Sequence, residues 1–280
     1  MTAGSSLYTE HLDLGYADRT IVQDLCLRVA DDRILALLGP NGSGKSTILK
    51  GMARILKARA GAVYLDGEAI HRQPTKRVAR KLAILPQGPE APEGLTVAEL
   101  VSYGRFPYQR GFGGADAQDL LMVDWALKIT GMTDLASRPV GTLSGGQRQR
   151  AWIAMALAQG TKFLLLDEPI TFLDVAHQLE VLRLLRKLNA EEGRTVAFVV
   201  HDLNLAARFA DQLALVQEGK LVAFGPPAQV LTRDHLKRVF GVDADILTDP
   251  RTGSPVCVAH PLEGETGRPR DGGIPDQSVE

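Results

Sequence analysis

A glycine-rich stretch near the start of the chain, GPNGSGKST at residues 39–47, has the residue types and spacing of a phosphate-binding loop. Its glycines let backbone N–H groups approach phosphate oxygens, and the helix expected after the loop directs its positive end at them. Lys45 can reach the β- and γ-phosphates, and the Ser46 hydroxyl can ligate Mg²⁺. The loop therefore predicts a nucleoside triphosphate site, whose residues are Gly39, Pro40, Asn41, Gly42, Ser43, Gly44, Lys45, Ser46 and Thr47.

Two adjacent carboxylates, Asp167 and Glu168, follow the apolar run FLLL at 163–166. Because α/β folds bind ligands at the carboxyl ends of their strands, Asp167 can join the Mg²⁺ shell and Glu168 can polarise an attacking water. Taken alone, the pair is equally well explained as a helix cap at a strand end. In combination with the glycine-rich loop, the metal-and-base interpretation is favoured.

Three further side chains are candidates because of their position. His201 follows the apolar run VAFVV and can hydrogen-bond the γ-phosphate and the Glu168 region. The alternative is a structural histidine whose hydrogen bonds are all made within the protein. The Gln87 amide, also at a strand end, can contact both metal and water, although a surface glutamine is the alternative. Tyr16 can stack on a base, or be an ordinary tyrosine of a core or sheet edge.

A second possible anion cradle opens the run LSGGQRQRAWIAMAL at 143–157. Ser144, Gly145 and Gly146 precede a helix-like segment, an arrangement that presents bare backbone N–H groups to an anion. The cradle has no lysine of its own at its mouth. This residue pattern raises the question of what supplies the cation there.

The elements that position these residues follow from hydrophobic patterning. Alternating segments in the opening third predict an antiparallel sheet, and the continuous apolar runs before each candidate residue predict buried strands of an α/β fold. The predicted divisions are a core at 1–88 and 141–225 with the antiparallel sheet at its N-terminus, a mostly helical insertion at 89–140, a short extension at 226–261 and a disordered tail at 262–280.

Composition excludes several classes of function. The 280 residues carry a net charge of −1, which gives no electrostatic case for nucleic acid or an anionic membrane surface. We find no signal peptide and no apolar stretch near the roughly 20 residues that a bilayer requires, so any membrane role depends on a partner. The two cysteines lack metal-site spacing, and the alternating segment DLCLRV places Cys26 in the core.

Taken in chain order, these segments resemble the nucleotide-binding subunit of ATP-binding cassette (ABC) transporters from Tyr16 to about residue 225. The resemblance implies a P-loop NTPase of ABC type, with a RecA-like core, an antiparallel β subdomain and a helical subdomain, that hydrolyses ATP with Mg²⁺. The motifs it implies are the A-loop aromatic Tyr16, Walker A at 39–47, the Q-loop at Gln87, the signature at 143–147, Walker B at 163–168, the D-loop Phe172-Leu173-Asp174 and the switch histidine His201.

The resemblance also implies roles for the individual residues. Catalysis falls to Lys45, Gln87, Glu168 and His201, and the metal ligands are Ser46, Gln87 and Asp167. Gln147 and Asp174 join Ser144, Gly145 and Gly146 among the nucleotide-binding residues. Family members form head-to-tail dimers with two ATP molecules between the Walker motifs of one subunit and the signature motif of the other. The second cradle then needs no lysine, because Lys45 of the opposite subunit supplies it.

Within the family, the chain is similar to ATPases of ferric-siderophore importers. This similarity implies membrane permease subunits docked by 88–140, an indirectly coupled substrate-binding protein and a place at the cytoplasmic face of the cell membrane. Gly88 and Ile170 depart from the usual pattern without removing a catalytic group. Import of haem, cobalamin or a metal ion, and a soluble cluster-assembly ATPase, remain as alternatives. The stretches that carry the similarity are 84–108, 143–159, 171–178 and 243–256.

Overall fold

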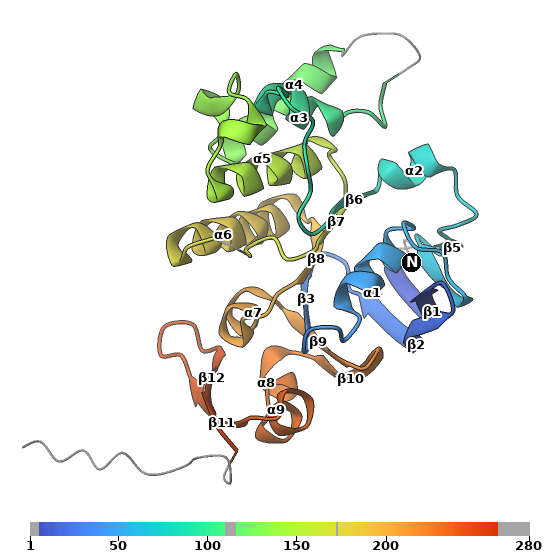
Figure 1. Cartoon of the computed structure of the whole chain (residues 1–280), viewed down its shortest axis with the longest axis vertical. Helices are drawn as coiled ribbons and strands as arrows, with labels where there is room; N and C mark the ends of the chain where they lie inside the picture. Colours follow the sequence, from blue (N-terminus) through green and yellow to red (C-terminus); the bar gives the residue numbers. More distant parts are fainter. Residues whose placement is uncertain (1–5, 110–115, 172, 263–280) are drawn as a thin grey trace, which may run out of the picture.

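The computed structural model describes residues 6–109, 116–171 and 173–262 (Figure 1). A mainly parallel sheet lies at its centre, with the strand order β10-β9-β3-β8-β7-β6. Every neighbouring pair in it is parallel except β10 with β9. The strands are β3 (Ile34–Leu38), β6 (Leu82–Leu85), β7 (Phe163–Leu166), β8 (Thr195–Val199), β9 (Gln212–Gln217) and β10 (Lys220–Gly225). The α/β expectation is confirmed.

The parallel strands are apolar throughout because both faces of their sheet are covered. Side chains of β3 alternate between the two faces. Ala36 and Leu38 belong to one buried cluster, which includes α5, α6 and the strand residues on that side. Leu35 and Leu37 belong to the other, together with α1 and the N-terminal strands. The central sheet is therefore buried on both faces, and it supports the residues that follow the ends of its strands.

An antiparallel sheet with the order β2-β1-β4-β5 packs beside this core, drawn in blue to cyan in Figure 1. Its strands are β1 (Leu7–Tyr16), β2 (Arg19–Val29), β4 (Ala60–Leu65) and β5 (Glu68–Ala69). The expectation that Cys26 lies in the core is wrong. Leu25 and Leu27 point into the core, so the intervening Cys26 faces outward and is exposed.

Helices α3 (Val97–Tyr103), α4 (Ala117–Ile129) and α5 (Gly145–Ala158) gather at one end of the molecule (Figure 1). Short 3₁₀ turns at Thr133–Leu135 and Val140–Thr142 lead into α5. Both α3 and α4 contact α5, so the group of packed helices continues beyond residue 140, where the sequence suggests the insertion ends.

The other helices flank the sheets: α1 (Lys45–Met52), α2 (Thr75–Ala79), α6 (Val175–Glu192), α7 (Leu203–Phe209), α8 (Pro227–Val230) and α9 (Arg233–Phe240). The hairpin of β11 (Asp243–Thr248) and β12 (Pro255–His260), which the sequence did not suggest, is tied to α7 by hydrogen bonds between Asn204 and Cys257. From residue 263 onward, the expected tail lies outside the described residues. Within the part of the chain that is described, no helix has the length and apolar character to cross a bilayer.

Candidate functional site

Four parallel strands end at the same edge of the central sheet, and each is followed by a candidate residue or loop. The glycine-rich loop follows β3, Asp167 and Glu168 follow β7, His201 follows β8, and Gln87 follows β6. A cavity of ≈ 560 Å³ opens at this edge. The predicted residues that line it are Tyr16, Asn41, Gly42, Gly44, Lys45, Ser46, Thr47, Gln87, Glu168 and His201. Residues separated by up to 185 positions in the chain thus meet in one site (Tyr16 to His201, 201 − 16).

Glycines are required in the loop because of its backbone path. Gly44, the N-cap of α1, has φ 103°, a left-handed conformation that side chains disfavour. Gly39 has φ 149°, and a Cβ there would lie 2.0 Å from the carbonyl oxygen of Val216. The loop therefore keeps close contact with β9 and leads directly into the N-terminus of α1.

Lys45 is buried under the loop that it serves. Its Nζ donates hydrogen bonds to the carbonyl oxygens of Gly39 and Pro40, each at 2.8 Å, and lies 3.5 Å from the hydroxyl of Ser43. Burial lowers the pKa of the ammonium group, whereas the charges of Glu168 and Asp167 raise it. The loop carbonyls hold the cation at the base of the cavity, where an anionic ligand can compete for it.

Ser46 and Asp167 form an oxygen-rich pair beside the lysine. The Ser46 hydroxyl donates to Oδ1 of Asp167 at 2.8 Å. Burial raises the pKa of Asp167, against the lowering effect of that hydrogen bond. Its Oδ2 is buried and has no hydrogen-bond partner among the described residues. Hard oxygen donors with one free, buried carboxylate oxygen fit the preferences of Mg²⁺.

Glu168 is held from two sides. Its Oε1 lies 2.8 Å from Nε2 of His201, and its Oε2 accepts a 3.0 Å hydrogen bond from the Thr171 hydroxyl. Burial alone would raise its pKa, but the bonds from His201 and Thr171 and the charges of His201 and Lys45 hold it below the ordinary value. The side chain is 10% exposed and that of His201 is 43% exposed, so the pair faces the cavity from its wall. An ionised carboxylate in this position can accept a proton from water.

The N-terminal hairpin forms the rim of the cavity. Tyr16 is 46% exposed, which leaves its ring free to stack on a planar ligand. Arg19, its cross-strand partner, and Ile21 also line the cavity and were missed in the sequence, as was Thr171. In the sequence, these residues could have been found from their position: Arg19 and Ile21 lie close to Tyr16 in the chain, and Thr171 lies close to Glu168.

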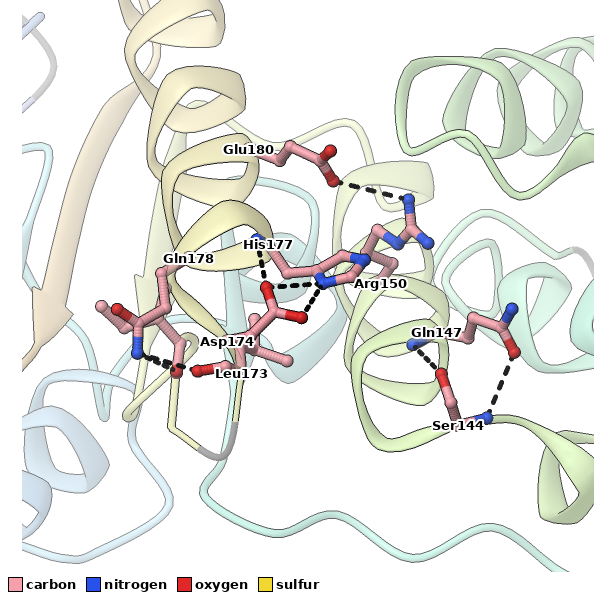
Figure 2. A network of polar contacts seen from close by, with 9 residues as sticks. Ser144, Gln147, Arg150, Leu173, Asp174, His177, Gln178 and Glu180 are labelled. Atoms are coloured by element: carbon pink, nitrogen blue, oxygen red, sulfur yellow. Dashed lines mark hydrogen bonds and ion pairs between the residues drawn. The ribbon is translucent and has the colours of Figure 1, made fainter.

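The second cradle does not line this cavity. Ser144 is the N-cap of α5, and its hydroxyl accepts a 3.3 Å hydrogen bond from the backbone N–H of Gln147. In return the Gln147 amide oxygen accepts from the N–H of Ser144 at 3.1 Å (Figure 2). This capping box fixes the helix start, and Ser144 and Gly145 are exposed to the outside.

Asp174 lies beside this cradle rather than in the cavity (Figure 2). It caps α6 by accepting from the backbone N–H of His177 at 2.9 Å, and both of its carboxylate oxygens lie 2.8 Å from Nδ1 of that histidine. A Cβ on Gly146 would lie 3.8 Å from the His177 ring, so the starts of α5 and α6 are neighbours. Phe172 of the expected D-loop lies outside the described residues.

The fold and this cavity define a P-loop nucleotide-binding protein of α/β type. A family model described as "ABC transporter" matches residues 22–171. The chain is 58% identical to the iron(3+)-hydroxamate import ATP-binding protein FhuC of Bacillus subtilis, over 92% of this chain and 96% of that protein. The chain belongs to the ABC transporter family, as an ATP-hydrolysing subunit.

Other relatives carry similar names. The ferric enterobactin transport ATP-binding protein FepC of Escherichia coli is 46% identical over 89% of this chain and 92% of its own. The hemin import ATP-binding protein HmuV of Bordetella pertussis is 41% identical over 88% and 95%, respectively.

Solved structures show the same fold. An inward-facing ABC transporter of metal-chelate type matches with TM-score 0.80 and 30% identity, over 93% of this chain and 99% of that one. The dimeric ABC transporter cassette MJ0796 matches with TM-score 0.71 and 27% identity, over 79% and 98%. The expected ABC-type fold is confirmed.

Proposed function

We propose that the chain energises import of an iron(III)–siderophore complex by hydrolysing ATP in a head-to-tail dimer. The observation that carries the substrate class is the 58% identity, over nearly the whole chain, to a protein named for iron(3+)-hydroxamate import. The ferric enterobactin relative supports the same class. The ferric complex is the cargo of the permease and is not expected to contact this subunit.

For hydrolysis, we assign the base to Glu168, because its lowered pKa keeps it ionised and its carboxylate faces the cavity. His201 orients that carboxylate and can reach the terminal phosphate, while Lys45 and the loop N–H groups offset phosphate charge. Tyr16 stacks on adenine. Ser46, Gln87 and Asp167 would hold Mg²⁺, which supplies charge neutralisation at the phosphates.

The dimer follows from the division of the anion-binding groups. Lys45 and the loop lie in one cavity, while Ser144, Gly145, Gly146 and Gln147 lie outside it. A second copy in head-to-tail orientation would bring the α5 N-terminus against the phosphates held by the first. Asp174, which contacts the His177 ring beside Gly146, would then lie in the same interface. ATP would shift the population toward the closed dimer, and hydrolysis would shift it back toward the open state.

Docking to a membrane permease is assigned to the region 88–140. A groove of ≈ 410 Å³ supports this assignment. Its lining residues are Pro89, Glu90, Ala91, Pro92, Glu93, Gly94, Pro139, Val140, Gly141, Thr142 and Arg148. It can accept a short segment of a permease, which would place this subunit at the cytoplasmic face of the cell membrane, with a substrate-binding protein acting through the permease.

Uptake by cells lacking the chain tests the proposal. Restoring wild-type protein should recover accumulation of radiolabelled ferric hydroxamate, whereas Glu168→Gln should not. Accumulation of haem or cobalamin, but not of the ferric hydroxamate, would overturn the siderophore assignment. Haem is the second candidate because of the 41% identical hemin import relative.

Co-purification separates transport from a role in cluster assembly. Affinity-tagged protein from detergent-solubilised membranes should recover a polytopic partner. Recovery in a complex without any membrane-embedded protein would contradict transport while leaving the ATPase chemistry in place.

A further inference from the structure

Three side chains with metal-binding atoms converge on the outer face of the antiparallel sheet, away from the nucleotide cavity. His11 comes from β1, and Asp24 and Cys26 come from β2. One ligand atom from each (an imidazole nitrogen, a carboxylate oxygen and the Sγ of Cys26) lies within 4.8 Å of the other two. None of the three lines the ATP cavity.

An irregular backbone brings the three together. The pairing of β1 with β2 shifts register between Thr9 and Leu12 and again between Leu12 and Leu14. At these shifts His11 has φ 46° and Asp24 has φ 51°, left-handed conformations that are uncommon for residues other than glycine. A regular ladder would give each of these residues a fixed cross-strand neighbour, whereas the bulges re-aim their side chains toward one another.

The contacts within the cluster keep its donor atoms together. Nδ1 of His11 lies 2.6 Å from Oδ1 of Asp24, and the backbone N–H of His11 donates to Sγ of Cys26 at 3.3 Å. Asp13 accepts a 2.7 Å hydrogen bond from the N–H of Asp24 and so holds that residue in place. Among the described residues, His11 is the only ion-pair partner of the Asp24 carboxylate.

We propose that His11, Asp24 and Cys26 form a binding site for Zn²⁺. Imidazole, carboxylate and thiolate are the three ligand types that Zn²⁺ takes in proteins, and three protein ligands leave a fourth position for water. The donor set differs from the all-oxygen surroundings of Ser46 and Asp167, so the two sites select different cations. The His11 and Asp24 side chains are 79% and 75% exposed, so they can rotate to admit the ion.

Binding is coupled to protons. Imidazole and thiol groups bind a metal ion in their deprotonated forms, so zinc binding to His11 and Cys26 releases protons. Zinc affinity should therefore rise with pH.

Cobalt substitution tests the proposal on the untagged full-length chain without nucleotide, because ATP itself binds divalent cations. Co²⁺ should give the thiolate-to-metal charge-transfer absorption of a cysteine-ligated site, and Zn²⁺ should abolish it stoichiometrically. Cys26→Ser should remove the band, whereas Cys257→Ser should keep it because that second cysteine is buried in the C-terminal hairpin. Asp18→Asn, a change of an exposed carboxylate on the same hairpin, is a further control with intact cysteines.

Calorimetric titration with Zn²⁺ gives the second readout. His11→Ala should weaken binding by more than about 100-fold, since even changes to residues that only orient metal ligands cost about 10–100-fold. Zn²⁺ should also raise the unfolding midpoint of wild type and Asp18→Asn but not of Cys26→Ser. Absence of the cobalt band in wild type, or undiminished zinc affinity in Cys26→Ser, would overturn the proposal.

Discussion

Nε2 of His201 lies 2.8 Å from Oε1 of Glu168, although the two residues are separated by 33 positions in the chain. They meet because β7 and β8 are parallel neighbours and each residue follows the carboxyl end of its strand. Glu168 itself has φ 53°, so its backbone turns sharply after the strand. The contact ties the orientation of the proposed base to a residue that can also reach phosphate.

Replacing Glu168 by Gln should stop turnover without stopping ATP binding. The amide keeps the shape of the side chain and its contacts with His201 and Thr171, but it cannot accept a proton. Loss of a general base costs about 10²–10⁴-fold in rate. Steady-state hydrolysis measures this loss, and size-exclusion chromatography with ATP should show dimer accumulating. Rapid turnover by this variant would remove Glu168 as the base.

The stability contributed by Glu168 should depend on pH in a defined direction. Its folded pKa lies below the ordinary value of 4.5, which we take for the unfolded chain. The contribution is therefore present above 4.5 and is lost as pH falls through the folded pKa. Urea unfolding of wild type and Glu168→Gln at several pH values should show a difference that shrinks in acid. A difference that grows as pH falls would contradict the assigned direction.

Ser144 offers a test that separates helix capping from nucleotide contact. Ser144→Ala would remove the cap of α5, at a cost of about 1 kcal/mol, and so confuse the two roles. Ser144→Asp keeps a good N-cap residue but places a negative charge where the phosphate of the opposite subunit would lie. We expect nearly wild-type thermal stability and unchanged ATP binding by the monomer, with ATP-driven dimerisation and turnover lost.

A matched variant, Ser144→Asn, caps the helix without adding charge. It should therefore dimerise with ATP more readily than Ser144→Asp. Equal dimerisation by these two variants would argue against a phosphate at this helix N-terminus.

Two glycines of the phosphate loop should differ in their tolerance of alanine. A Cβ on Gly39 would lie 2.0 Å from the Val216 carbonyl oxygen, whereas a Cβ on Gly42 would meet nothing within 4 Å. Gly42 still has φ 76°, so Gly42→Ala should cost about 1–2 kcal/mol of unfolding free energy from backbone strain alone. Gly39→Ala should cost more than about 3 kcal/mol, because a clash adds to the strain. Chemical denaturation of both variants compares them directly, and equal costs would contradict the proposed clash.

Much of this protein is determined locally in the sequence. The buried strands are continuous apolar runs, and GPNGSGKST at 39–47 encodes its own loop because its glycines permit the required φ values. Positions at strand ends identified Gln87, Glu168 and His201, because parallel strands bring their carboxyl ends to one edge. All three line the cavity at that edge.

The tertiary structure decided the features that depend on contacts between residues far apart in the chain. Arg19 and Ile21 line the cavity only because the hairpin folds against the loop, and the α5 N-terminus lies apart from the cavity because its helix packs with α3 and α4. Cys26 faces outward because it alternates with the buried Leu25 and Leu27, but its position beside His11 and Asp24 depends on register shifts between β1 and β2, which no local pattern reveals. Short-range conformational preferences are written in neighbouring residues, whereas strand register and helix packing depend on contacts formed only when the whole chain closes.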